Sequence, residues 1–376
     1  MKKKSISIIV FQFLAFTVFL LFSCKKSSNV APADVTLSDI GSLFIQTNET
    51  SGNRILQYNR SESGKLTYVA SYETRGLGTS AGLGNQGSII LSDNKKFVIV
   101  TNAQSNDIST FKFDNNKLIF VGVYPSLGIK PISVTQKGNL VYVLNVSSDQ
   151  VAGFTISDKG ELIPIAGSIQ SLSGVNVLGA QISFVRPNVL VVTERQSNNI
   201  STFVLNNMGS AGNRQTVKSF TNTPFGFGVG AEGRIYVTEE NVGVSTGGQL
   251  SSYAITPSGD VNFISTFRTG ELGICWAVVN SKETAVFATN TTNNTISSFG
   301  LTGVTGVIKT HFISQNLGSG FAPIDIALSK NDNFVYVLNS KSNQILGYAV
   351  ADGALAPVSG SEISRLPIAA NGLAVY

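Results

Sequence analysis

Short runs of β-branched and apolar residues, each followed by a polar turn, recur along the chain from about residue 40 to its end. In the clearest repeat, an apolar strand closes on Asn or Glu, and a polar loop then leads into a second strand such as Ile-Ser-Thr-Phe. The seven copies close at Asn48, Asn102, Asn145, Glu194, Glu239, Asn290 and Asn339. Their spacing of about 48 residues, with several short strands in each unit, is typical of a β-propeller.

Each repeat contains four strands, and the first of them is the innermost strand of a blade. This strand recurs at 88–91, 133–135, 183–185, 226–229, 277–279, 325–328 and 372–375. The first repeat has no inner strand before Leu43, whereas the chain ends with a spare one at 372–375. The pattern therefore predicts an all-β, seven-bladed β-propeller of four-stranded blades over residues 41–376. We expect the C-terminal strand to join the N-terminal blade, which removes both free sheet edges.

The first 24 residues carry a different pattern. Lysines precede an apolar run from Ile6 to Phe22, which is short for a membrane-spanning helix and typical of a secretory signal. The run ends in Leu21-Phe22-Ser23-Cys24, which resembles a bacterial lipobox, whose cysteine thiol takes the lipid. We expect a lipoprotein signal peptide at 1–23, lipidated Cys24 with a polar tether at 24–40, and a periplasm-facing protein anchored in the cell envelope. The alternative is an uncleaved N-terminal anchor.

Composition narrows the range of functions. The chain has 42% hydrophobic residues and a formal net charge of +5, to which Lys2, Lys3 and Lys4 of the predicted signal contribute. The remainder is nearly neutral, so we expect no nucleic-acid partner. One His (His311) and two Cys exclude zinc fingers, haem attachment and a disulfide framework. We expect a monomer with no cofactor and no side-chain metal site, although backbone carbonyls in a channel could still hold calcium.

The phrases Tyr142-Val143-Leu144-Asn145 and Tyr236-Val237-Thr238-Glu239 resemble the YVTN-type repeat. Residues 42–376 as a whole resemble the seven-bladed lactonase family, which includes 6-phosphogluconolactonases and carboxymuconate-lactonising enzymes. The resemblance implies metal-independent lactonase activity in the axial channel, carried by a His, an Arg and a Glu. Here His311 falls in the outermost strand of its blade, so the resemblance assigns no channel histidine. The same repeats also occur in non-enzymatic surface proteins.

Departures from the repeat are candidates for function, because residues shared by all blades serve the scaffold. Two consecutive copies close on Glu194 and Glu239 instead of Asn, and Arg195 and Glu240 follow them. The second strand of a blade ends where the inner strand begins, so these side chains are expected at one mouth of the channel. Polar, aromatic and acidic residues near the starts of inner strands are expected at the same mouth: Gln86, Gln181, Phe225, Trp276 and Asp325.

This set suits a small lactone or a sugar-like ligand. We expect Glu194 or Glu239 to activate water and Arg195 to stabilise the oxyanion. The predicted ligand-binding residues are Gln86, Gln181, Phe225, Trp276, Glu240 and Asp325. Structural alternatives remain open: the two glutamates could cap loops as Asn does, Trp276 could pack between blades, and Asp325 could bond to backbone amides. Cys275 is expected to be a buried small residue.

The segment Gly82-Leu83-Gly84-Asn85-Gln86-Gly87 matches GxGxxG, but it precedes an inner strand and not a helix. We therefore expect a loop at 76–87 over the channel mouth, with Arg75 at its base, and no dinucleotide site. Two functions follow. One is a periplasmic, lipid-anchored, lactonase-like hydrolase. The other is a non-catalytic propeller that binds a small molecule or a protein partner. An open mouth beside Glu194 favours the first, and a plugged mouth favours the second.

Overall fold

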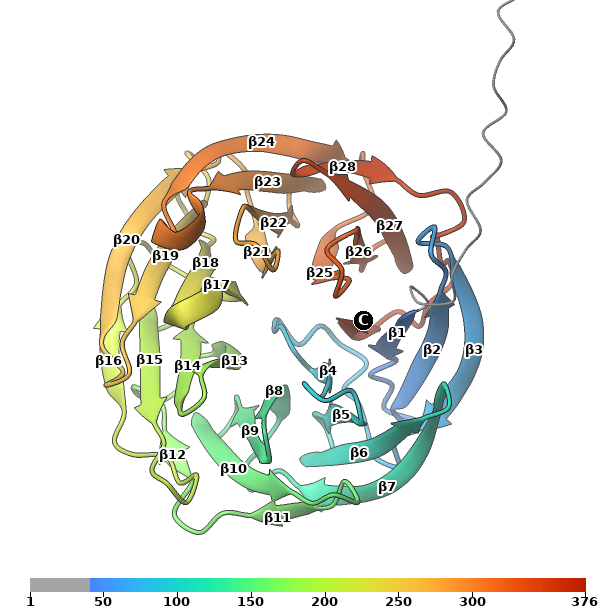
Figure 1. The fold of residues 1–376 in the computed structure, drawn as a ribbon, viewed down its shortest axis with the longest axis vertical. Helices are drawn as coiled ribbons and strands as arrows, with labels where there is room; N and C mark the ends of the chain where they lie inside the picture. Colours follow the sequence, from blue (N-terminus) through green and yellow to red (C-terminus); the bar gives the residue numbers. More distant parts are fainter. Residues whose placement is uncertain (1–40) are drawn as a thin grey trace, which may run out of the picture. The chain divides into compact units, whose positions relative to one another are not determined.

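A computed structural model describes residues 41–376 (Figure 1). The predicted signal peptide, the lipidation site Cys24 and the tether to residue 40 lie outside the described residues. Over 41–376 the chain forms a ring of seven antiparallel sheets, as the repeat predicts. Two single-turn 3₁₀ helices interrupt it, at Ala231–Gly233 and Gly303–Thr305. Within this part of the chain no helix is long and apolar enough to cross a membrane.

Each blade runs from an inner strand at the axis to an outer strand at the rim. The first blade comprises β29 (Asn371–Val375), β1 (Gly41–Gln46), β2 (Arg54–Arg60) and β3 (Leu66–Glu73). The second comprises β4 (Ile89–Leu91), β5 (Phe97–Asn102), β6 (Asp107–Asp114) and β7 (Lys117–Pro125). The third comprises β8 (Pro131–Lys137), β9 (Leu140–Asn145), β10 (Gln150–Ile156) and β11 (Leu162–Pro164), with the short β12 (Gln170–Ser171) also pairing with β10.

The remaining four blades repeat this order. The fourth comprises β13 (Gly179–Arg186), β14 (Val189–Glu194), β15 (Asn199–Val204) and β16 (Gln215–Lys218). The fifth comprises β17 (Pro224–Val229), β18 (Arg234–Glu239), β19 (Gln249–Ile255) and β20 (Val261–Arg268). The sixth comprises β21 (Ile274–Val279), β22 (Ala285–Asn290), β23 (Thr295–Leu301) and β24 (Ile308–Asn316). The seventh comprises β25 (Pro323–Leu328), β26 (Phe334–Asn339), β27 (Gln344–Ala351) and β28 (Ala354–Pro357).

The C-terminal strand closes the ring, which confirms the offset predicted from the spare inner strand. β29 pairs antiparallel with β1, so that Phe44 lies opposite Ala374 and Ile45 opposite Leu373. The pairing continues past the strand, where the Tyr376 N–H donates to the Ser42 carbonyl at 3.1 Å. The inner edge of the first blade is therefore hydrogen-bonded and is not left open as a free sheet edge.

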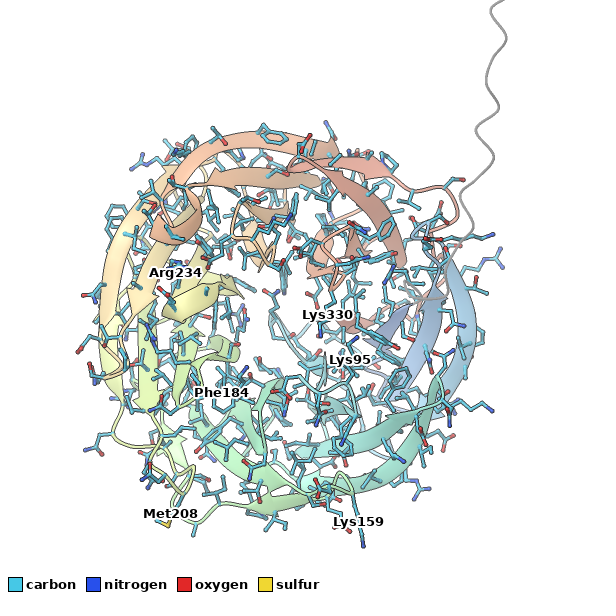
Figure 2. All side chains as sticks on the ribbon, viewed as in Figure 1. Lys95, Lys159, Phe184, Met208, Arg234 and Lys330 are labelled. Carbon is cyan, nitrogen blue, oxygen red and sulfur yellow. The ribbon has the colours of Figure 1, made fainter. Side chains whose placement is uncertain are left out.

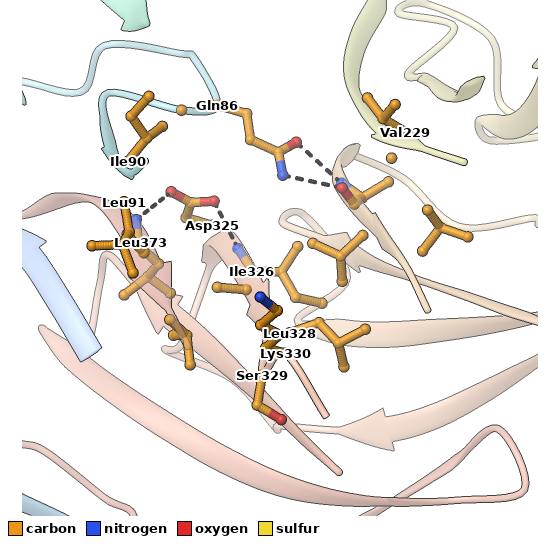
Figure 3. A pocket seen from close by; sticks show the side chains of 18 of the residues that line it. Gln86, Ile90, Leu91, Val229, Asp325, Ile326, Leu328, Ser329, Lys330 and Leu373 are labelled. Carbon is orange, nitrogen blue, oxygen red and sulfur yellow. Dashed lines mark hydrogen bonds between the residues drawn. The ribbon is translucent and has the colours of Figure 1, made fainter. Parts of the chain in front are cut away.

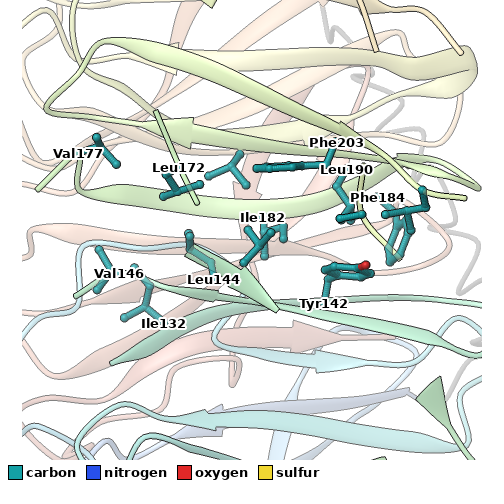
Figure 4. Close-up of a cluster of buried hydrophobic side chains, with 14 of the residues drawn as sticks. Ile132, Tyr142, Leu144, Val146, Leu172, Val177, Ile182, Phe184, Leu190 and Phe203 are labelled. Carbon is teal, nitrogen blue, oxygen red and sulfur yellow. The ribbon is translucent and has the colours of Figure 1, made fainter. Parts of the chain in front are cut away.

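The core lies between the blades. In residues 41–376, seven clusters of buried hydrophobic side chains occupy the seven inter-blade interfaces. Figure 4 shows the cluster between the third and fourth blades, where Tyr142 packs against Phe184. The Tyr142 hydroxyl donates to the Gly209 carbonyl of the next blade at 2.6 Å, and Tyr336 donates to Gly64 at 2.7 Å. The repeated tyrosine thus links neighbouring blades, including the seventh to the first.

Candidate functional site

The loop that precedes β4 crosses the axial channel. Figure 1 shows it reaching from the second blade into the centre of the ring. The Gln86 amide donates to Ala277 on the sixth blade at 3.0 Å, and the Gln86 N–H donates to Ala180 on the fourth blade at 3.2 Å. The Asn85 side chain donates to Ile132 on the third blade. Contacts with three other blades hold this loop as a plug, so the channel is closed on the side where the inner strands begin.

The two aromatic residues expected at this mouth lie behind the plug. The rings of Phe225 and Trp276 are 4.9 Å apart, and each residue is only 5% exposed. The Trp276 indole N–H donates to the Asn85 carbonyl, so the tryptophan holds the plug in place. Both rings belong to a buried cluster that extends to the sixth and seventh blades. These contacts favour the packing interpretation of Trp276 over direct ligand stacking.

The structure does not present Glu194 as a catalytic group. Its carboxylate is completely buried and accepts hydrogen bonds from the Ser173 N–H at 3.1 Å and from the hydroxyls of Ser197 and Ser201 at 2.7 and 2.6 Å. Ser173 lies in the connection that leads into β13, and Ser201 lies on β15. The carboxylate therefore ties this connection to its own blade, as the loop-capping alternative requires, and no ligand can reach it.

Glu239 is enclosed in the same way. Its carboxylate accepts hydrogen bonds from six donors, which are Ser219, Phe220, Thr221, Gln249, Ser251 and Tyr253. All lie in the connection before β17 or on β19, and the glutamate is completely buried. The expectation that Glu194 and Glu239 converge on a ligand is corrected by these contacts. Each Glu replaces the usual Asn because a longer acceptor can satisfy more loop donors.

Arg195 and Glu240, one residue further on, do come together. Arg195 directly follows β14, and its guanidinium lies over the Phe225 ring, 4.8 Å from the centroid. Its Nε donates to the Leu178 carbonyl at 3.3 Å. Glu240 follows β18 on the adjacent blade, and both side chains are half-buried. In the described part of the chain neither forms a salt bridge, although each influences the ionisation of the other.

Burial sets the electrostatics of this mouth. It raises the pKa of the Glu240 carboxyl, and the Arg195 guanidinium opposes that rise. Burial also lowers the pKa of Arg195, whereas the nearby Cys275 and Glu240 raise it. Burial, reinforced by Glu240, also raises the pKa of the Cys275 thiol, so this cysteine stays a protonated, buried residue as expected. The loop can approach the guanidinium closely because residue 84 is Gly: a Cβ there would lie 2.8 Å from an Arg195 nitrogen.

On the other side of the plug, the axis holds a cavity of about 480 Å³. Figure 3 shows Gln86 and Asp325 at its inner end. The Asp325 carboxyl accepts the N–H groups of Ile326 at 2.8 Å and Leu373 at 3.0 Å, as the backbone-bonding alternative predicts. Gln181 also lines the cavity, and its amide bonds to both backbone groups of Phe227 on the next blade. Burial raises the pKa of Asp325 to about 8.

Two further residues considered in the sequence, His311 and Arg75, lie outside this channel. His311 lies on the outer strand β24, as expected, and contacts the Ser297 hydroxyl at 2.9 Å. Arg75 packs on Phe120 of β7 at 4.0 Å, at the beginning of the loop that ends in the plug. Over residues 41–376 no cluster of three or more His, Cys, Asp or Glu side chains is arranged to hold a metal ion.

The sequence reasoning missed the opposite mouth of the channel. Lys95 and Lys330 lie there, in the turns that join the first two strands of the second and seventh blades. The signal was present, because Ser92-Asp93-Asn94-Lys95 and Ser329-Lys330-Asn331-Asp332 occupy the same turn in two repeats. Such turns must surround the mouth at which the inner strands end.

Comparison with known proteins places the fold. Residues 47–178 match the family model described as Lactonase, 7-bladed beta-propeller. A solved structure from Bacteroides fragilis, a proposed 6-phosphogluconolactonase, is 18% identical with a TM-score of 0.72, covering 91% of this chain and all of its own. The periplasmic gluconolactonase of Pseudomonas aeruginosa is 15% identical with a TM-score of 0.68, covering 89% of this chain and 99% of its own. No curated protein matches the chain in sequence.

Proposed function

We propose that this chain, which is a lactonase-type seven-bladed propeller, hydrolyses a small lactone at the mouth formed by Arg195 and Glu240. One observation carries the proposal. An acid whose pKa is raised by burial and a guanidinium without a salt bridge in the described chain lie on adjacent blades, near enough that each influences the ionisation of the other. Groups with strongly perturbed pKa values are common among catalytic residues. The similarity to lactonase-type propellers supports the choice of reaction.

The reaction needs a base and a group that stabilises an oxyanion. Glu240 accepts a proton from water as the water oxygen attacks the lactone carbonyl carbon. The carbonyl electron pair moves to its oxygen, which becomes an anion beside Arg195. When this tetrahedral species collapses, the bond from the carbonyl carbon to the ring oxygen breaks. The ring oxygen then takes the proton from Glu240, and the product is a hydroxy acid.

The surroundings of the two groups fit these roles. Phe225 and the Leu178 carbonyl hold the guanidinium in one orientation, so little reorganisation is needed when charge develops. Arg195 stays charged despite its lowered pKa, because the ordinary value of a guanidinium lies far above neutral pH. Rate should rise with pH through the raised pKa of Glu240, since only the ionised carboxylate acts as the base.

Kinetics of paired variants test the proposal. Glu240→Gln should lower kcat for glucono-δ-lactone by about 10²- to 10⁴-fold, the usual contribution of a general base. Arg195→Gln should cost about 10²- to 10³-fold, as for loss of an oxyanion donor. Glu161→Gln and Arg268→Gln, at exposed positions, are matched controls that should leave turnover unchanged. A wild-type protein inactive on a panel of aliphatic and sugar lactones would overturn the proposal.

A non-catalytic binding propeller is the second candidate, and the plug supports it. The loop at 82–87 closes the channel beside Glu194, and the glutamates expected to act there are enclosed by their own blades. In this alternative the Arg195 mouth binds an anionic ligand without turning it over. Titration with gluconate separates the two functions, because a pure binding site would hold gluconate while glucono-δ-lactone stays intact beyond its spontaneous hydrolysis.

We also propose that the protein works in the periplasm on a lipid anchor at Cys24. The lipobox-like segment at 21–24 supports the anchor, and the periplasmic gluconolactonase with the same fold supports the compartment. Cys24→Ala should abolish labelling by radioactive palmitate and leave an uncleaved precursor. Normal processing of that variant would instead indicate an ordinary signal peptidase site.

A further inference from the structure

The axial cavity is an open chamber with a mixed lining, in which apolar side chains lie beside polar groups. Its sides are formed by half-exposed side chains from inner strands of several blades, among them Ile90, Val229, Leu328 and Val375. Most pockets that bind small molecules have a similar volume and the same mixture of apolar walls with a few polar groups. Exposed apolar surface gathered in a concavity commonly marks a binding site. The chamber is separated from the Arg195 mouth by the plug at Gln86.

Lys330 lines the rim of the chamber, and Lys95 lies near it with its ammonium over the Tyr376 ring, 4.6 Å from the centroid. Figure 2 shows Lys95 and Lys330 near the axis, in contrast to Lys159 at the outer edge. Burial lowers the pKa of Lys95, and the neighbouring charge of Lys330 lowers it further. Within residues 41–376 neither lysine forms a salt bridge, and the Asp332 carboxylate beside them accepts hydrogen bonds from Ser281. Two adjacent ammonium groups favour an anion between them.

The inner end of the chamber offers a hydrogen bond. Asp325 is 2% exposed, has no cationic partner among the described residues, and keeps its proton near neutral pH because burial raises its pKa to about 8. A protonated carboxyl accepts the two backbone N–H groups and can still donate to an oxygen in the chamber. Lys330 is five positions from Asp325, at most about 16 Å at the rise of an extended strand.

We propose that this chamber is a second ligand site, independent of lactone hydrolysis, for a medium-chain hydroxy-carboxylate. The carboxylate lies between Lys95 and Lys330, the alkyl chain lies along the apolar side chains, and the distal hydroxyl reaches Asp325. An extended ten-carbon chain is shorter than the upper limit of about 16 Å, and the flexible side chain of Lys330 covers the difference. The chemistry at each end fixes the direction in which the ligand enters.

Calorimetric titration of the purified protein with 10-hydroxydecanoate at pH 7 and low salt tests the site. We expect one molecule bound per chain, about tenfold tighter than decanoate or 1,10-decanediol, each of which lacks one polar end. Leu328→Trp fills the chamber and should weaken binding at least 30-fold, whereas Ile163→Trp, at an exposed position on β11, should have no effect. Lys330→Glu should weaken binding about tenfold, and Lys159→Glu should not.

Val229→Trp provides a second obstruction from another blade, in case Leu328→Trp fails to fold. The proposal is overturned if 10-hydroxydecanoate does not bind at millimolar concentration, or if it binds equally well to both chamber variants. An equal loss of binding in Ile163→Trp would indicate that 10-hydroxydecanoate associates with the outer surface, which would also overturn the proposed chamber site. Turnover of lactones by Leu328→Trp should match the wild type, so failure of this site and failure of the proposed hydrolase are distinguished.

Discussion

Asp325→Asn should change how the stability of the propeller depends on pH. The carboxyl is buried at the inner end of the axial cavity, and burial raises its pKa from the ordinary 3.8 to about 8. The folded chain holds this proton more tightly than the unfolded chain does. The bound proton therefore contributes fully to the free energy of unfolding below about pH 4. The contribution falls as the pH rises and is exhausted once the pH passes about 8. Asn cannot titrate, so the variant lacks this dependence.

The magnitude follows from the difference between the two pKa values. Each pH unit between them changes the free energy of unfolding by about 1.4 kcal/mol, which amounts to about 4 kcal/mol between pH 5 and pH 8. For a folded region of this size the entropy of unfolding is about 0.7 kcal/mol per kelvin. The wild type should therefore lose about 6 °C in melting temperature relative to Asp325→Asn over that interval.

Thermal melts of both proteins at half-unit steps from pH 5 to pH 9 measure this difference. The Asn nitrogen cannot accept the Leu373 N–H, so Asp325→Asn loses stability by an amount that is the same at every pH. The readout is therefore the slope of the melting temperature against pH. Asp158→Asn, at an exposed turn of the third blade, is the matched control and should follow the wild type throughout. A constant difference between wild type and Asp325→Asn from pH 5 to pH 8 would refute the reasoning.

Three further predictions concern the scaffold and the site. Deleting residues 372–376 removes β29 from the first blade and should lower the melting temperature of the whole ring by more than 10 °C in calorimetry; an unchanged value would contradict closure by this strand. Tyr142→Phe should lower the free energy of unfolding, measured by denaturant titration, by about 1 kcal/mol because it loses the hydrogen bond to Gly209. Tyr236→Phe should leave this free energy almost unchanged, because the Tyr236 hydroxyl lies near Arg234 but has no partner at hydrogen-bonding geometry. Glu239→Gln should destabilise the fold by about 2–3 kcal/mol while the folded molecules keep their turnover. Glu240→Gln should instead lose turnover and keep its stability. Loss of turnover in Glu239→Gln at unchanged stability would restore a catalytic role for Glu239.

The architecture of this protein could be predicted from its sequence because the fold repeats a local pattern. Antiparallel strands joined by short turns pair with their neighbours in the chain, so each unit of about 48 residues specifies its own blade. Seven copies indicated seven blades, and the unmatched inner strand at 372–375 indicated how the ring closes. The singular residues Arg195 and Glu240 could be found for the same reason, since a repeat shows where it is broken.

The environment of each candidate side chain was decided only by the tertiary structure. Glu239 and Glu240 are neighbours in sequence, yet one is enclosed by six donors and the other faces the mouth with Arg195. The plug depends on Gln86 reaching Ala277, 191 positions away, and no local pattern encodes that contact. The pKa of Asp325 likewise depends on burial among strands from several blades. Strand periodicity is a property of neighbouring residues, whereas burial and charge at the axis arise only when seven separate blades meet there.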